Sequence, residues 1–142
     1  MSSTDPYLIV GGGPVGLTAA LEMSRRDLPV HIIDDDFAPS PESRALAIHA
    51  PTLDMLEASG VTERLLTAGH KVRNVVVHEK GRVILSIPLS DIPHRYNFIL
   101  SLAQSQTEQI LTDALAETGI QLDYGTRLES LSCHPAGATR PH

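Results

Sequence analysis

The chain has 142 residues, 42% hydrophobic and 20% charged, which is the composition of an ordinary globular domain and excludes a disordered segment. A formal net charge of −6, with no run of Lys or Arg, excludes nucleic acid and an anionic membrane as expected partners. Cys133 is the single cysteine, and the sequence has neither a signal-peptide pattern nor a membrane-spanning apolar run, so we expect a cytoplasmic protein without an internal disulfide.

The stretch over 7–36 has the pattern of a dinucleotide-binding unit. Its parts follow in order: an apolar strand over 7–10, Gly11-Gly-Gly-Pro-Val-Gly16, an alanine- and leucine-rich helix to about Arg26, and a second apolar strand over 30–33 that runs into Asp34-Asp-Asp36. The spacing from Gly11 to Asp34, 34 − 11 = 23 residues, is close to the roughly 20 residues of the dinucleotide fingerprint. This order of strand, glycine motif, helix, strand and acid predicts a bound nucleotide.

Each residue of the glycine motif has a physical task in that interpretation. Gly11 permits a sharp turn because a residue without Cβ can take a positive φ. Gly13 leaves room for a pyrophosphate near the backbone, and Gly16 lets the helix pack closely on the strand. Pro14 suits the first helical turn, and the free N–H groups there, at Val15 and Gly16, would face the phosphates.

The acids after the second strand are the next candidates. Asp34 is expected to accept hydrogen bonds from a ribose diol, although a carboxylate in this place is often only solvated. Asp35 is grouped with it as a cofactor-binding candidate. Three adjacent acids would repel a 2′-phosphate, which disfavours NADP at this position and leaves FAD or NAD.

A long insertion over about 37–103 separates the second strand from the next long helix. Its expected elements are a Pro/Ser loop over 37–44, short helices from Pro51 to Gly60 and over 61–68, and strands over 72–78, 83–89 and 96–102, with a hairpin turn at 79–82. Together these strands predict an antiparallel meander.

After the insertion the chain returns to helix and strand. Ser105 and Glu108 have capping-box spacing before a helix that ends at Gly119, and 120–124 is the candidate third parallel strand. A further strand is expected within 127–132, followed by an irregular tail over 133–142. The predicted fold class is α/β, a partial Rossmann-like domain over 1–132 with a parallel βαβ core and the inserted antiparallel meander.

Three blocks, in this order, resemble the N-terminal third of flavin-dependent aromatic hydroxylases of the p-hydroxybenzoate and phenol hydroxylase type, especially members that act on aromatic polyketides. The blocks are Val10 to Asp34, Pro39 to His49 with Thr52 to Leu56, and Leu102 to Glu108. The resemblance implies FAD as cofactor, NADH or NADPH as reductant, and dioxygen as co-substrate for hydroxylation of a phenolic or polyketide aromatic.

The resemblance also assigns two residues of the insertion. Arg44 would reach the FAD phosphate or ribityl region, where a guanidinium makes bidentate contacts with phosphate. Gln104 would contact the ribityl or flavin side, since its amide both donates and accepts hydrogen bonds. Two alternatives stay open: Arg44 pairs with the acids over 34–36, or Gln104 is an ordinary residue before a helix cap.

The chain departs from the family at two positions and in extent. Asp35 stands where a basic residue is common, and Pro51 replaces a common arginine. The later Asp-Gly and Gly-Asp segments of the family and most of the aromatic pocket are absent. The resemblance therefore implies a truncated, catalytically incomplete chain, with the aromatic substrate bound through the missing domain.

Two other function classes remain as alternatives. One is a non-catalytic nucleotide-binding or partner-binding module that associates, with itself or another chain, through an open sheet edge. The other is an NAD-dependent dehydrogenase fragment, which the long insertion disfavours. No catalytic acid, base or nucleophile is assigned, because a flavin carries the chemistry itself, and the seven histidines have no metal-ligand spacing.

Overall fold

The computed structural model describes residues 5–37, 45–133 and 139–141. They form two compact units, one from Met1–Ser40 with Leu111–His142 and the other from Pro41–Ile110. The second unit contains most of the predicted insertion together with the first half of the helix that follows it.

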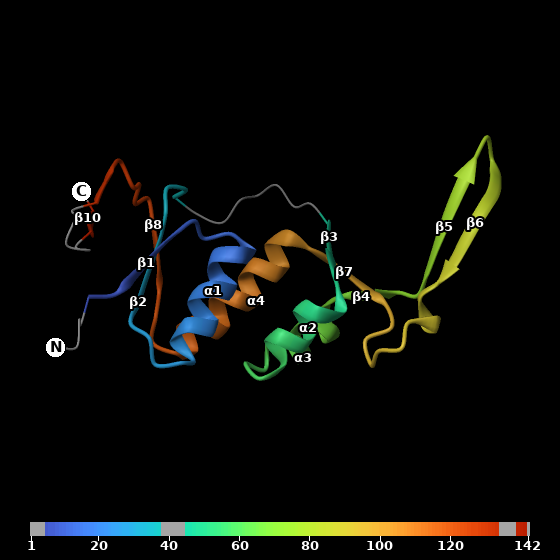
Figure 1. Ribbon diagram of the computed structural model, residues 1–142, viewed down its shortest axis with the longest axis horizontal. Coiled ribbons are helices and arrows are strands. Elements are labelled where there is room, and N and C mark those ends of the chain that lie inside the picture. Colours follow the sequence, from blue (N-terminus) through green and yellow to red (C-terminus); the bar gives the residue numbers. More distant parts are fainter. Residues whose placement is uncertain (1–4, 38–44, 134–138, 142) are drawn as a thin grey trace. The chain divides into compact units, whose positions relative to one another are not determined.

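The first unit has a parallel three-stranded sheet with strand order β1-β2-β8 (Figure 1). The elements are β1 (Tyr7–Val10), α1 (Pro14–Ser24), β2 (Val30–Asp34) and β8 (Leu122–Tyr124). Ile32 pairs with Ile9 on one side and with Leu122 on the other. The predicted parallel βαβ core and its third parallel strand are therefore confirmed.

The core of the first unit follows from helical and strand periodicity. In α1 the buried side chains recur at a spacing of three to four residues, Leu17, Ala20 and Leu21, and Ile32 and Ile33 of β2 are buried as well. A helix that buries one stripe on a sheet whose second strand is apolar on both faces is the arrangement expected of a parallel α/β layer.

The second unit has an antiparallel sheet with strand order β3-β7-β4 and two short helices. Its elements are β3 (Ala45–Ile48), α2 (Ala50–Glu57), α3 (Val61–Ala68), β4 (His70–Val72) and β7 (Ile99–Ala103). Both short helices were predicted, and their inward leucines, Leu53, Leu56 and Leu65, are almost fully buried.

A hairpin of β5 (Asn74–Glu79) and β6 (Arg82–Pro88) confirms the predicted turn, at which Lys80 and Gly81 both have positive φ. The predicted single meander differs from the sheets observed. The hairpin is a two-stranded sheet of its own, and β7 pairs with β3 and β4 instead of continuing from β6. Neither β3 nor β4 was predicted, because three or four residues show too little alternation to identify a strand.

The remaining elements are η1 (Leu89–Asp91), α4 (Gln104–Glu117), β9 (Leu131–Cys133) and β10 (Thr139–Pro141). Helix α4 begins at Gln104, so Ser105 lies inside the first turn and is not the cap. Strand β10 pairs antiparallel with β9, so the described part of the tail predicted as irregular, residue 133 and 139–141, is strand. Among the residues described, none of the helices has the length and apolar character that crossing a membrane requires.

Candidate nucleotide-binding site

The turn between β1 and α1 depends on two glycines. Gly11 has a φ of +109°, and its N–H donates to the carbonyl oxygen of Ile33 at 2.8 Å. A Cβ at Gly16 would lie 1.9 Å from the carbonyl oxygen of Gly11. No side chain fits at Gly16, so the helix begins against the turn as closely as the sequence motif predicts.

Gly13, in contrast, faces open space. It is the N-cap of α1 in an extended conformation, and a Cβ built there would meet nothing within 4 Å. No side chain caps this helix, and Pro14 in the first turn has no N–H. The N–H groups of Val15 and Gly16 have no partner within the helix by its geometry, so they are available to an anion at the helix N-terminus.

Asp34 lies beside this turn. Its Oδ2 accepts a hydrogen bond from the N–H of Gly12, and its Oδ1 accepts one from the N–H of Asp36 at 2.8 Å. A carboxylate has about four acceptor positions, so both oxygens retain capacity for further donors. The structure thus brings the predicted ribose-binding acid next to the predicted phosphate-binding turn.

Gly12 is a site residue that sequence reasoning missed, since it occupies a variable position of the fingerprint. A Cβ on Gly12 would lie 2.5 Å from Cδ2 of Leu122 and 3.1 Å from Oδ2 of Asp34. The absence of a side chain therefore lets its N–H approach Asp34. The run of three glycines was the available signal.

The segment after β8 is bound to the segment after β2. Gly125 donates to the carbonyl oxygen of Asp36 at 2.8 Å, and Thr126 donates to that of Asp34 at 2.9 Å. Asp35, another predicted cofactor-binding residue, is exposed and forms an ion pair with Arg127 at 3.0 Å. Its charge is partly offset, which weakens the predicted repulsion of a 2′-phosphate.

The other two candidates belong to the second unit. Gln104 is the first residue of α4, and its amide donates to Oε1 of Glu108 at 2.8 Å. Arg44 lies outside the described residues. Ala45, which follows Arg44 in the sequence, pairs with Ala103, which precedes Gln104. The register of β3 and β7 therefore joins the two sequence segments that the family resemblance had singled out.

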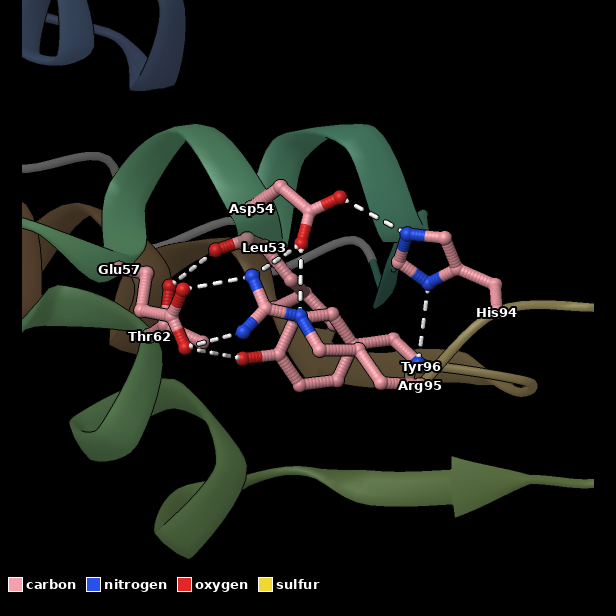
Figure 2. Close-up of polar contacts among 7 residues, drawn as sticks. All are labelled: Leu53, Asp54, Glu57, Thr62, His94, Arg95 and Tyr96. Carbon is pink, nitrogen blue, oxygen red and sulfur yellow. Dashed lines mark hydrogen bonds and ion pairs between the residues drawn. The ribbon is translucent and has the colours of Figure 1, made fainter.

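The second unit also contains a polar cluster that the sequence did not predict (Figure 2). Nη2 of Arg95 lies 2.6 Å from both Oδ1 of Asp54 and Oε2 of Glu57. Nε2 of His94 lies 2.8 Å from Oδ2 of Asp54, and the N–H of Tyr96 donates to Nδ1 of His94 at 3.0 Å. Because Nδ1 is the acceptor, Nε2 carries the proton donated to Asp54.

Ionisation in this cluster follows its contacts. Hydrogen bonds from Arg95, and then from His94, hold the pKa of Asp54 below its ordinary value, and the carboxylates of Asp54 and Glu57 raise the pKa of Arg95. Desolvation is the largest cause that raises the pKa of Tyr96, and the hydrogen bond from its hydroxyl to Glu57 is the next. The donors and acceptors are matched to one another, so the cluster links α2 to the segment before β7.

Comparison with known proteins gives a family match over nearly the whole chain. Residues 5–140 match the family described as FAD binding domain. The chain is 39% identical over 132 residues to 6-methylpretetramide 4-monooxygenase of Streptomyces rimosus, covering 92% of this chain and 23% of that protein. It is 34% identical to pentachlorophenol 4-monooxygenase of Sphingobium chlorophenolicum, covering 92% and 25%. The chain therefore spans about a quarter of the length of these curated relatives.

Solved structures share the fold. The crystal structure of p-nitrophenol 4-monooxygenase PnpA from Pseudomonas putida DLL-E4 matches with a TM-score of 0.82 at 23% identity, covering 93% of this chain and 37% of that one. The flavin-dependent monooxygenase PieE, solved with FAD and substrate, matches with a TM-score of 0.77 at 25% identity, covering 96% and 28%. The predicted α/β fold class is confirmed.

Proposed function

Because this chain belongs to the FAD binding domain family, we propose that it binds FAD with the pyrophosphate at the glycine turn and the adenosine ribose at Asp34. The observation that carries the proposal is the open space at Gly13, in front of an uncapped helix N-terminus, with the Asp34 carboxylate bound to the adjacent Gly12. A diphosphate suits unpaired N–H groups, and a ribose diol suits a carboxylate with free acceptor capacity.

The proposed contacts come from two groups of residues. In the first unit they involve the glycine turn and the acids, namely Gly11, Gly13, Pro14, Val15, Gly16, Asp34 and, less directly because it pairs with Arg127, Asp35. From the family resemblance we propose that Arg44, which lies outside the described residues, and Gln104 serve the ribityl or flavin side of FAD. The backbone pairing of Ala45 with Ala103 supports a shared role for these two residues.

For the whole protein we propose an aromatic monooxygenase. FAD, reduced by NADH or NADPH, would supply the chemistry that activates dioxygen, and this chain's residues would bind and orient it. The aromatic substrate, phenolic or polyketide in class, would bind through sequence beyond this quarter-length portion, so the isolated chain should be catalytically incomplete. The names of the two curated relatives support this reaction class. The single cysteine supports a cytoplasmic location.

The test of FAD binding is Gly13→Val in the 142-residue chain. A valine side chain would occupy the proposed pyrophosphate position, so we expect FAD affinity to fall at least roughly a hundredfold, as for loss of several charge-assisted hydrogen bonds. The fold should survive, because Gly13 has a φ of −73° and open space around it. A fluorescence titration with FAD measures the affinity, and circular dichroism checks that the fold is intact.

The matched control is His49→Val. His49 is also an extended N-cap without a side-chain cap bond, and a proline follows in the first turn of α2. This variant should leave FAD affinity unchanged. If Gly13→Val binds FAD as tightly as the parent chain, the phosphate assignment is wrong.

A second candidate function is a partner-binding module. The observation that favours it is the hairpin β5–β6. Within the part of the chain that the structure describes, its two strands pair with each other and with no other strand, and they expose apolar side chains, among them Val83, Ile84, Leu85 and Ile87. Exposed apolar strands with open edges favour association. Light scattering that finds a monomer at high concentration would count against this candidate. A parallel titration with NAD and FAD tests the dehydrogenase alternative.

A further inference from the structure

Phe37 is an exposed aromatic residue at the edge of the proposed nucleotide site. Its side chain is 91% exposed, whereas Phe98, the other phenylalanine of the chain, is 7% exposed. Phe37 directly follows the acids Asp34 to Asp36, so it lies just beyond the proposed ribose-binding carboxylate. A phenylalanine this exposed forfeits most of the free energy that its burial would provide.

The backbone after β8 supports one side of this residue. A Cβ at Gly125 would lie 3.1 Å from both Cδ1 and Cε1 of Phe37, so the absence of a side chain at Gly125 leaves room for the ring. Gly125 has a φ of +69°, which favours glycine, and its N–H donates to Asp36 at 2.8 Å. The ring is therefore placed against a fixed backbone segment while most of its surface stays open.

The contacts run in one continuous series from the glycine turn to this ring. The Asp34 carboxylate accepts from the N–H groups of Gly12 and Asp36. The carbonyl oxygen of Asp36 accepts from the N–H of Gly125, and Gly125 lies beside the ring of Phe37. The parts of an adenine dinucleotide follow in the same order: pyrophosphate, ribose, base. If the first two parts occupy the glycine turn and Asp34, the third part reaches the end of the series.

We propose that Phe37 is the platform on which the adenine base of the bound dinucleotide stacks. The inference rests on the proposed function and extends it to a residue outside the fingerprint. A base presents an aromatic face whatever its edge groups, and an exposed phenylalanine offers a matching face without needing a hydrogen bond. The ion pair between Asp35 and Arg127 offsets one of the acidic charges beside the ring.

The test compares two probes on the 142-residue chain, ADP and inorganic pyrophosphate, by isothermal titration calorimetry. Phe37→Ala should weaken ADP binding by roughly tenfold or more, the range for loss of one base–aromatic stack, and leave pyrophosphate binding unchanged. Leu131→Ala shortens another exposed apolar side chain of the same unit, and it should change the affinity for neither ADP nor pyrophosphate. The exposure of Phe37 means that folding is expected to be unaffected, and circular dichroism checks this.

A spectroscopic variant gives a second readout. The chain has no tryptophan, so Phe37→Trp introduces a single indole at the proposed contact. This variant should retain ADP binding, and its fluorescence should be quenched by ADP but not by pyrophosphate.

The outcomes separate the two proposals. If the parent chain binds ADP and Phe37→Ala binds it equally well, the stacking inference is overturned while the proposed function stands. Equal weakening of ADP and pyrophosphate would also overturn stacking, since the base would not be what the ring contacts. If the folded parent chain binds neither probe nor FAD, the proposed function and the inference both fail.

Discussion

The end of β2 and the cluster beside α2 each contain an aspartate that accepts hydrogen bonds from two residues, but the donor groups differ. Asp34 accepts from the backbone N–H groups of Gly12 and Asp36. Asp54 accepts from side chains, those of His94 and Arg95. Under the proposed function, Asp34 binds a ligand, whereas Asp54 holds two segments of the fold together.

The difference lies in what happens to the charge. Backbone N–H groups carry no formal charge, so they orient the Asp34 carboxylate without pairing it with a cation, and under the proposed function its remaining acceptor positions take a ribose hydroxyl. In the cluster beside α2, the carboxylates of Asp54 and Glu57 share the one positive charge of Arg95, so each has a charged side-chain donor within the fold. Polar groups that bond one another in this way link segments and do not mark a binding site.

The largest effect is expected at the backbone fit that places Asp34. Gly16→Ala should destabilise the chain by about 3 kcal/mol or more, or prevent folding, because the added methyl group would lie 1.9 Å from the backbone carbonyl oxygen of Gly11. Gly13→Ala, in open space at an N-cap, should cost less than about 1 kcal/mol. Urea unfolding of the two variants measures the contrast. Equal destabilisation would mean that the turn is not closely packed at Gly16.

The first unit could be predicted from sequence because its determinants are local. The strand, glycine turn, helix and acid lie within 7–36, and each has a steric or hydrogen-bonding reason that a sequence displays directly. Gly11 requires a positive φ, and the structure has it. The need for glycine at position 12 was not predicted. It arises because Leu122 lies against Gly12, and Leu122 belongs to a strand more than a hundred positions later in the sequence.

The second unit was less predictable because its determinants are distant in sequence. Asp54 and Arg95 are 41 positions apart, and in a sequence each is indistinguishable from a solvated surface charge. The hairpin β5–β6 was predicted from its turn and its valines. The partners of β7, in contrast, lie on either side of two helices, and no local signal identifies β3 and β4 as those partners.

An intermediate effect is expected from the pair Asp34→Asn and Asp54→Asn. Asp34→Asn should weaken ADP binding roughly tenfold, because it removes the charge that strengthens a hydrogen bond to the ribose diol. Asp54→Asn should leave ADP affinity unchanged and lower stability instead, because Arg95 and His94 lose a charged acceptor. Calorimetric titration measures the ADP affinity of each variant, and urea unfolding measures its stability. A loss of ADP affinity in Asp54→Asn would break the distinction between the two acids.

The smallest effect is a pH dependence confined to the cluster beside α2. The hydrogen bond from Arg95, and to a smaller extent the one from His94, lowers the pKa of Asp54 in the folded chain below its ordinary value of 3.8. A depressed carboxyl pKa contributes stability that is fully present above the ordinary pKa and is lost as the pH falls from that value toward the lowered pKa.

We therefore expect the stability difference between the parent chain and Asp54→Asn to be constant from pH 7 to about pH 5 and to shrink below about pH 4. Asp54 is partly exposed, so solvent screens the interaction and the change should be small beside that of Gly16→Ala. Urea midpoints of the two chains across this range give the difference directly, since the other carboxyl groups titrate in both. A difference that is unchanged at pH 3 would mean that Asp54 draws no stability from its charge, and the two aspartates would then differ only in the donors that surround them.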